Sequence, residues 1–331
     1  MQSFKPSPFL RHIGSASGCR RASVSLLPLW LSLSLLSGCA QLPARAPLAG
    51  MAWDVNRQRL LPVADVLRRT GAADIILLGE THDNPDHHAI ETTIFDTVAA
   101  RRPAVLVLEQ YDLEQQPALD AIARSDDDHP ARLVALQRLM GAGWEWPGYQ
   151  PLLATAIRRG LPVVAANASR ATLRQVSKEG FAALGPGQAT RLGLEGGWSA
   201  AQQSLLGAEI AEGHCGSLPA PAVAAIALAQ RARDAVMADR ILAQPSAAVV
   251  AILGRGHVRH DLAVPVYLRQ RAGNRRFISL GLVETNGSDV PTDYDSSRLG
   301  ALYDFILFTR PVIRKNDPCV GLTPIDPRQR P

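Results

Sequence analysis

Aromatic residues and cysteines are both scarce in this chain. Aromatic side chains make up 5% of the 331 residues, and the four cysteines form neither a CxxC nor a CxxCH pair. The spacing of the cysteines argues against a cysteine-based zinc site and against covalent attachment of a c-type haem. Beyond residue 38, no stretch reaches the roughly 18 continuous apolar residues of a spanning helix, so we expect no membrane span there.

Acidic residues are missing from the first 38 positions. This segment carries Lys5, Arg11, Arg20 and Arg21, which supply four units of the formal net charge of +5. The sequence pI near 9.3 therefore reflects the N-terminal segment, and we expect no nucleic-acid-binding surface. Charged residues at 20% and apolar residues at 47% exclude a disordered chain and indicate a globular one.

The N-terminal segment has the three parts of a secretory signal. Arg20-Arg21 precedes an apolar run at 24–36, and Leu36-Ser37-Gly38-Cys39 follows. The run is too short to cross a bilayer as a helix, so we interpret residues 1–38 as a signal peptide that is removed. The last four residues resemble the lipobox of bacterial lipoproteins, which implies that Cys39 carries acyl chains such as palmitate. The alternative is an ordinary cleaved signal in which Cys39 stands by chance.

Lipidation would decide where the protein resides. Each acyl CH₂ buried in lipid contributes roughly 0.8 kcal/mol, so three chains on Cys39 would hold the protein firmly. Ala40 stands where an Asp would indicate retention in the inner membrane. We therefore expect a protein anchored to outer-membrane lipid that faces the periplasm.

The mature chain begins with a segment rich in proline and glycine. We interpret residues 39–52 as a lipidated tether and residues 53–331 as the folded domain. Cys215 and Cys319 then lie in an oxidising compartment, where they either form a disulfide or remain two independent thiols. The sequence leaves both alternatives open.

Short apolar runs recur along the folded domain, and each ends at a polar residue or a glycine. Because they are apolar throughout rather than alternating, they are typical of strands buried on both faces. The expected strands are 74–78, 104–108, 161–166, 247–253, 277–280 and 305–308, and the expected helices between them include 87–100, 152–159 and 223–242. This alternation predicts an α/β fold, a mostly parallel β-sheet flanked by helices. Residues 112–148 and 171–221 contain no strand run and are expected to be helical insertions that form a smaller helical lobe.

Four polar residues follow directly after expected strands. Glu80 and His82 follow the first strand, Glu109 the second and His257 the fourth. Functional groups collect beyond the carboxyl ends of parallel strands, so we expect these four side chains to meet at one rim of the sheet. Glu80, His82 and His257 are candidate ligands for a divalent metal such as zinc, which would activate water. Without a metal, a histidine would serve as general base.

The segment after the first strand is rich in histidine. His82, His87 and His88 fall within seven positions, and the last two are expected to begin a helix with Asp86 as its N-cap. Imidazole can ligate a metal or donate to a carboxylate, but such residues can also cap the helix and pair locally. His214, between two glycines in the second helical insertion, is equally open to a functional and a structural role.

The stretch Ile76-Leu77-Leu78-Gly79-Glu80-Thr81-His82-Asp83-Asn84-Pro85-Asp86-His87-His88 resembles the ChaN-type haem-binding lipoproteins, a family of bacterial iron-uptake proteins. The likeness covers about residues 74–310. Supporting segments are 146–151, 162–167, 214–216, 229–238, 254–258 and 303–308. The resemblance implies an α/β fold with a helical lobe, a lipid anchor, and haem held at the surface, between two protomers in the case of a homodimer. A haem receptor or transporter would be a further partner.

Haem adds candidate ligands to the four rim residues. Tyrosine phenolate is one of the protein groups that hold haem iron, and Tyr149 is our choice among five tyrosines. Arg233 or Arg255 would pair with the propionates. The candidate haem-binding residues are His82, His87, His88, Tyr149, His214 and His257.

Gly-Glu-x-His together with a late Gly-x-Gly-His also resembles a wider superfamily that includes erythromycin esterases and Tiki-type metalloproteases. That resemblance implies a catalytic rim of Glu80, His82, Glu109 and His257. The alternative function is therefore a periplasmic hydrolase, an esterase or a metallopeptidase-like enzyme. A structural or interaction lipoprotein is the third interpretation, and fold-level kinship alone does not decide among them.

Overall fold

The computed structural model describes residues 48–141, 143–196, 198–244, 247–295, 299–315 and 319–322. The predictions for the signal peptide, for acylation of Cys39 and for most of the tether lie outside these residues. Residues 51 and 52, expected in the tether, already belong to the first strand.

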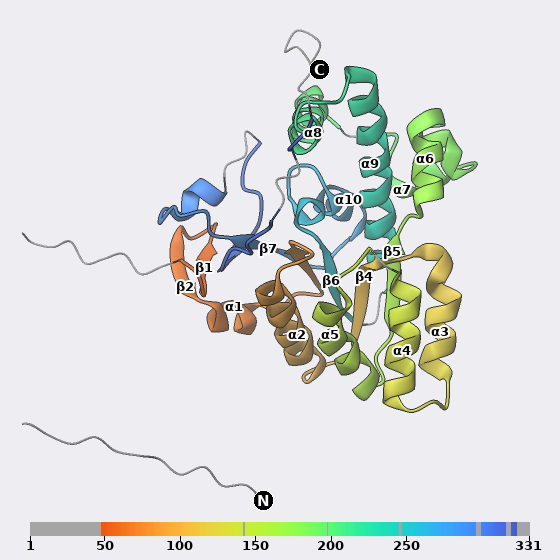
Figure 1. Ribbon diagram of the computed structural model, residues 1–331, viewed down its shortest axis with the longest axis vertical. Coiled ribbons are helices and arrows are strands. Elements are labelled where there is room, and N and C mark those ends of the chain that lie inside the picture. Colours follow the sequence, from red (N-terminus) through yellow and green to blue (C-terminus); the bar gives the residue numbers. More distant parts are fainter. Residues whose placement is uncertain are drawn as a thin grey trace, which may run out of the picture. The chain divides into compact units, whose positions relative to one another are not determined.

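An eight-stranded sheet carries the fold, in the order β2-β1-β8-β7-β3-β6-β4-β5 (Figure 1). The strands are β1 (Met51–Asp54), β2 (Arg59–Pro62), β3 (Ile75–Glu80), β4 (Ala104–Asp112), β5 (Val163–Asn167), β6 (Ala248–Gly254), β7 (Phe277–Glu284) and β8 (Phe305–Thr309). Neighbouring strands from β8 to β5 are parallel, whereas β1 pairs antiparallel with both β2 and β8. The six apolar runs correspond to β3–β8, so the predicted mostly parallel sheet is confirmed.

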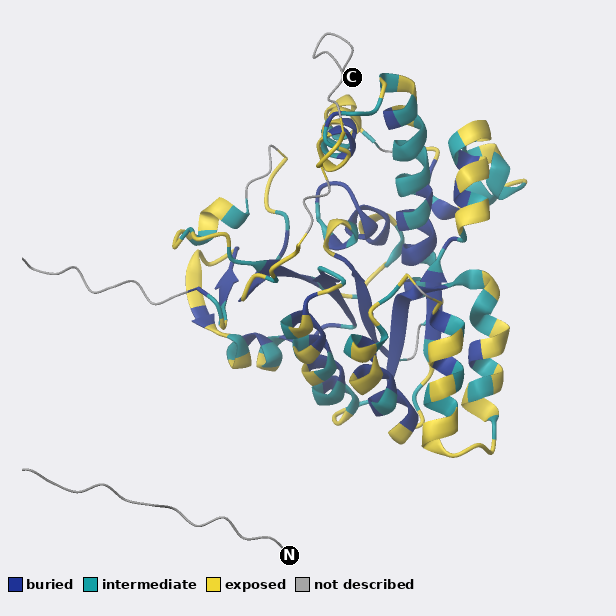
Figure 2. Cartoon of the chain, viewed as in Figure 1, coloured by how far each residue is buried: buried dark blue, intermediate teal, exposed yellow. Residues whose placement is uncertain are grey.

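Helices cover both faces of this sheet. They are α1 (Val63–Thr70), α2 (Pro85–Ala99), α3 (Gln116–Arg124), α4 (His129–Met140), α5 (Trp146–Arg158), α6 (Arg170–Glu179), α7 (Gln188–Leu192), α8 (Ala200–Gly213), α9 (Ala220–Leu242) and α10 (Val264–Arg271). No helix within the described part of the chain is long and apolar enough to cross a bilayer. Figure 2 shows the buried strands between helices whose outer sides are exposed.

Successive residues of β3 show how the two layers form. Ile75 and Leu77 pack with α9 and α10, whereas Ile76 and Leu78 pack with α2 and α5. Because side chains alternate along a strand, a strand that is apolar at every position can bury both faces. This is why the runs lack the polar alternation of a half-exposed sheet.

The two helical insertions pack on different faces of the sheet. Helices α3 and α4 join the apolar cluster of α2 and α5, while α6 and α7 join that of α9. Helix α8 packs against α9 in a small cluster of its own around Ile210 and Val223. The expected helical lobe is thus divided between the two layers. Cys215, just after α8, is bonded to Cys319, which answers the question that the sequence left open.

Candidate functional site

The strand register brings the four predicted rim residues together. Glu80 at the end of β3 lies opposite Gly254 at the end of β6, and the Gly254 N–H donates to Glu109 Oε2 at 2.6 Å. A Cβ at position 254 would lie 3.1 Å from His82 Nε2 and 3.4 Å from Glu109 Oε2, so glycine allows these side chains to approach. His257 Nε2 lies 3.5 Å from Glu109 Oε1. We call these four residues, Glu80, His82, Glu109 and His257, the rim.

Glu80 is the buried acceptor at the centre of the site. Its Oε1 accepts hydrogen bonds from His82 Nδ1 at 2.8 Å, from the Gln110 amide at 2.9 Å and from the Tyr149 hydroxyl at 2.5 Å. Burial alone would raise the pKa of Glu80, but the neighbouring imidazoles of His82 and His88 outweigh it and lower the pKa to about 2. Glu80 is therefore an anion near neutral pH. An ionised carboxylate only accepts, which makes His82 Nδ1 the donor.

His82 is the rim histidine that faces outward. Its side chain is 41% exposed, and its ring meets Trp144 edge-on at 4.8 Å between centroids. Burial would lower the pKa of His82, but the hydrogen bond to Glu80 and the charge of Glu109 raise it overall. With Nδ1 committed to Glu80, the Nε2 atom is the nitrogen that His82 can offer to a ligand.

His257 is held between two carboxylates. Its Nδ1 lies 2.7 Å from Asp234 Oδ1 on α9, on the opposite side of the ring from Glu109. Burial would lower the pKa of His257, but Glu109 and Asp234 together raise it. Asp234 therefore belongs to the site as the carboxylate that holds His257. A sequence clue to Asp234 is that this acidic residue follows Gln230 by one helical turn, among residues of α9 that are largely apolar.

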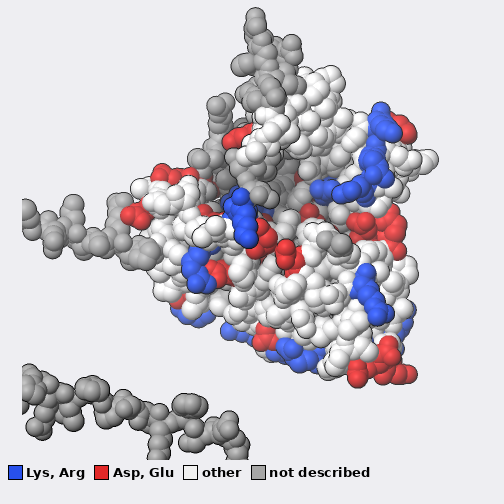
Figure 3. Space-filling view, in the orientation of Figure 1, with Lys and Arg blue, Asp and Glu red and all other residues white. Residues whose placement is uncertain are grey.

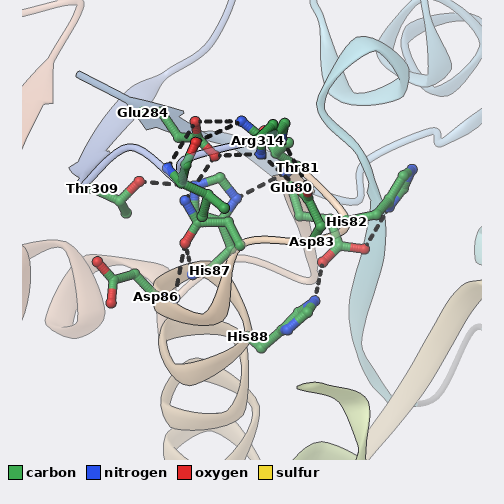
Figure 4. Close-up of polar contacts among 12 residues, drawn as sticks. Glu80, Thr81, His82, Asp83, Asp86, His87, His88, Glu284, Thr309 and Arg314 are labelled. Atoms are coloured by element: carbon green, nitrogen blue, oxygen red, sulfur yellow. Dashed lines mark hydrogen bonds and ion pairs between the residues drawn. The ribbon is translucent and has the colours of Figure 1, made fainter. Parts of the chain in front are cut away.

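His87 has a structural position. It is fully buried, its Nδ1 accepts the Thr81 N–H at 2.8 Å, and its Nε2 lies 2.9 Å from Thr309 Oγ1. Burial lowers the pKa of His87 to about 4, so the ring is neutral and Nε2 carries the hydrogen. Figure 4 shows the His87 ring between Thr309 and Thr81, which it contacts through its two nitrogens. Both nitrogens are occupied, and His87 has none to offer to iron.

The N-cap of α2 is Asn84, so the prediction of Asp86 is wrong. The Asn84 side chain accepts the backbone N–H groups of Asp86 and His87 at 2.8 and 3.3 Å. Pro85 occupies the first helical position, which suits its fixed φ and its missing N–H. Asp86 instead forms an ion pair with Arg310 at 2.7 Å.

Tyr149 and His88 lie behind the rim. Tyr149 is fully buried, its hydroxyl donates to Glu80, and its ring lies 4.6 Å from that of His88. In this arrangement the Tyr149 oxygen faces the interior and not the surface. His88 is 5% exposed and approaches Glu80 from α2. Two further residues of this layer, Gln110 and Glu91, were not predicted. Gln110 directly follows Glu109, and Glu91 lies one helical turn after His88.

A cavity of about 570 Å³ opens at the rim. It is lined by His82, Glu109 and Trp144, and by three cations, Arg170 and Arg174 from α6 and Arg233 from α9. Its other lining residues are Asp112, Gly143, Asn167, Leu173, Ser177, Ile226, Ala229 and Gln230. Basic and acidic side chains are interspersed over the face shown in Figure 3.

A second cavity of about 240 Å³ lies on the other side of Ile226 and Gln230, which line both. His257 and His214 line this second cavity. His214 Nδ1 lies 2.7 Å from the Ile210 carbonyl oxygen at the end of α8. The predicted ligands His82 and His214 therefore line different cavities.

The family follows from the sequence at residues 66–268. This stretch matches the model of a family described as haem-binding uptake, Tiki superfamily, ChaN. The chain belongs to this family. The expected resemblance is confirmed, and the matched region contains all four rim residues.

Solved structures show the same fold in a ChaN protein. The chain is similar to ChaN of Campylobacter jejuni, from a structure that reports cofacial heme binding, with a TM-score of 0.63 and 17% identity over 77% of this chain and 95% of that one. Fainter likenesses are to the type III effector HopBA1 (TM-score 0.43, 12% identity, 74% and 91% covered) and to an erythromycin esterase, EreC, in its open conformation (0.42, 14%, 73% and 81%). No curated protein matches the sequence.

Proposed function

We propose that the protein binds haem in the cavity at the rim, for iron uptake. The observation that carries the proposal is the combination of a half-exposed imidazole, an indole and three guanidinium groups around one cavity, in a member of a haem-binding family. A porphyrin needs a flat apolar contact, its propionates need cations, and its iron needs a ligand atom. His82, Trp144 and the three arginines supply these three kinds of group.

His82 is the proposed iron ligand at this site. The anion of Glu80 accepts the Nδ1 hydrogen, which fixes the tautomer and makes Nε2 a stronger donor to a metal. The Nε2 atom lies on the same rim as Glu109, beside the cavity that Trp144 also lines. Because the pKa of His82 is raised, a proton competes with iron for Nε2, and haem binding weakens as the pH falls.

The arginines supply the propionate contacts. Arg170 and Arg174 lie one turn apart on α6, and Arg233 comes from α9. Guanidinium groups bind carboxylates through charge-assisted hydrogen bonds. The Nε atom of Arg233 is buried and has no hydrogen-bond partner among the described residues, so it has donor capacity left for a ligand. Arg255, the other cation expected for this role, begins the turn that packs on Gly79 and does not line the cavity.

A hemin titration tests the proposal. We expect the purified protein to give a saturable shift of the Soret band at micromolar concentration, and His82→Ala to change the band position and weaken binding at least tenfold. His129→Ala, at the exposed start of α4, is the matched control and should bind like the wild type. Absence of a saturable shift in the wild type refutes haem binding, and an unchanged spectrum in His82→Ala refutes the assigned ligand.

The place of the protein in the cell is part of the proposal. Acylation of Cys39 would anchor it to the outer membrane, facing the periplasm, where it would pass haem to a receptor or transporter. The Cys215–Cys319 disulfide suits such an oxidising compartment. Labelled palmitate should enter the wild type and not Cys39→Ser, and membrane fractionation should place the labelled protein in the outer membrane.

A homodimer around haem is the proposed assembly. The support is the cofacial heme binding reported for ChaN of Campylobacter jejuni, because two haem groups that lie face to face can be contributed one by each of two copies. Sedimentation should then show a dimer that forms when hemin is added and that His82→Ala fails to form.

A hydrolase is the second candidate, favoured by the Asp234–His257–Glu109 arrangement. An imidazole whose Nδ1 is held by a buried aspartate can act as a general base through Nε2. His257→Ala should then abolish turnover of a model ester or peptide while leaving hemin binding intact. Lack of turnover by the wild type over a broad set of esters and peptides would remove this candidate.

A further inference from the structure

A second cluster of polar groups lies beneath the rim, on the side of α2. His88 and Glu91 are one helical turn apart, and both face Glu80 at the end of β3. The three residues are 5%, 0% and 2% exposed, and one ligand atom from each lies within 4.8 Å of the other two. Figure 4 shows Glu80 between His82 on one side and His88 on the other.

These groups lack the hydrogen bonds that buried polar atoms normally make. Both carboxylate oxygens of Glu91 are without a hydrogen-bond partner among the described residues, and so is Gln110 Oε1. Glu80 Oε2 and His88 Nε2 lie 3.2 Å apart, yet without the geometry of a hydrogen bond. Native proteins satisfy nearly all buried polar atoms, so the unpartnered atoms of Glu80, His88 and Glu91, which lie within 4.8 Å of one another, mark a place that a ligand would complete.

We propose that Glu80, His88 and Glu91 bind one divalent transition-metal ion of the Mn²⁺ or Fe²⁺ class. Two carboxylates and one imidazole form a mixed oxygen and nitrogen donor set that suits such an ion, and the two carboxylates, once ionised by the bound cation, would balance its charge. Metal–ligand bonds of roughly 2.0–2.2 Å place neighbouring donor atoms about 3 Å apart. The donor atoms, which lie within 4.8 Å of one another, would draw together by side-chain rotation to reach that geometry.

This site differs from the metal site that the sequence suggested on the rim. The two oxygens of Glu80 serve the two sites separately. Its Oε1 accepts hydrogen bonds from His82 on the rim and from the side chains of Gln110 and Tyr149. Its Oε2 faces His88 in the buried cluster. His82 and His257 are absent from the buried set. An ion there would fix the Glu80 carboxylate and, through it, the orientation of His82, and the inference does not depend on haem binding.

Metal analysis of the full-length protein tests the site. The protein is stripped with a chelator, incubated with Mn²⁺, desalted and analysed for bound metal. We expect about one equivalent in the wild type and at least a tenfold loss of affinity in Glu91→Gln, a nearly isosteric change. Glu114→Gln, an exposed carboxylate, is the matched control, and His257→Ala tests the rim; both should retain the ion.

Two results would overturn the inference. One is a wild type that holds no Mn²⁺ or Fe²⁺ above background. The other is retention of the ion in Glu91→Gln with loss in His257→Ala, which would place the ion on the rim. A second test needs only the wild-type protein, because an ion that binds the native state raises the melting temperature. A rise of several degrees with Mn²⁺ is expected, and no rise counts against the site.

Discussion

Asp234 on α9 positions His257 in the turn that follows β6, with 2.7 Å between Oδ1 and Nδ1. The contact links the rim to the helix that also carries Gln230 and Arg233 into the cavity. Helix α9 therefore contributes to the site twice, through a buried carboxylate behind the rim and through a cation on the cavity wall. A change in either group should have a distinct and measurable effect.

Replacing Asp234 with Asn should lower the pKa of His257. Burial disfavours the imidazolium, and the charges of Glu109 and Asp234 together overcome this cost. When the charge of Asp234 is removed, only Glu109 opposes the effect of burial, so the pKa of His257 should fall. An NMR pH titration of the imidazole resonances measures the change, and Asp126→Asn in an exposed loop is the control. A pKa that stays constant in Asp234→Asn would show that Asp234 does not influence the charge of His257.

Replacing Arg174 with Gln should weaken hemin binding without abolishing it. Arg174 is exposed, so solvent screening reduces the value of a single propionate contact, and we expect a loss of up to about tenfold. The dimethyl ester of haem, which lacks the propionate charges, should bind the variant and the wild type equally. Arg138→Gln on α4 is the control. Equal hemin affinity of wild type and Arg174→Gln would exclude Arg174 from the propionate contacts.

Replacing Gly148 with Ala should destabilise the protein and disturb the cluster around Glu80. A Cβ at position 148 would lie 1.9 Å from His88 Nδ1, so the ring must move inside a buried layer. Overpacking of this kind costs typically about 1–3 kcal/mol. Gly143→Ala is the control, because no atom lies within 4 Å of a Cβ at that position. Its free energy of unfolding should be within about 0.5 kcal/mol of the wild-type value. Denaturant unfolding measures the stability of both variants. Equal midpoints for the two would contradict the close packing of His88 on Gly148.

The parallel sheet was predictable because its strands are apolar at every position. The β1–β2 hairpin was not, since its strands are four residues each and β2 is largely exposed, which leaves no long apolar run. The meeting of the rim residues was also predictable. Parallel strands end at one edge, and Glu80, Glu109 and His257 each follow an apolar run that predicted a strand, although β4 itself continues past Glu109 to Asp112.

The layer behind the rim was beyond the sequence. Glu91 in the middle of a helix is normally interpreted as a solvated charge, and its burial follows from the packing of α2 on β3. Tyr149 was chosen for its chemistry, but the turn that begins α5 directs its hydroxyl to the interior carboxylate of Glu80. The orientation of these side chains depends on how the helices pack on the sheet, and no local sequence pattern predicts that packing.

Acid should weaken the contact between the C-terminal segment and the loop after β3. Arg314 bonds to Glu284 at 2.8 Å and also pairs with Asp83, and the Asn84 amide donates to Glu284 at 2.9 Å. The Arg314 guanidinium, outweighing burial, lowers the pKa of Glu284 from 4.5 to about 2.

A depressed carboxylate pKa fixes the sign of the pH effect. The unfolded chain binds protons at higher pH than the native state does, so this stability is present above about pH 4.5 and is lost as the pH falls toward 2. Because the Arg314 side chain is 40% exposed, screening limits the contribution to about 1 kcal/mol. Arg314→Gln should therefore be less stable than the wild type at pH 6 and nearly equal to it at pH 2.5. Urea unfolding at both pH values measures this, with Lys178→Gln as the exposed control. A stability difference that persists unchanged at pH 2.5 would show that Arg314 acts through packing and not through charge.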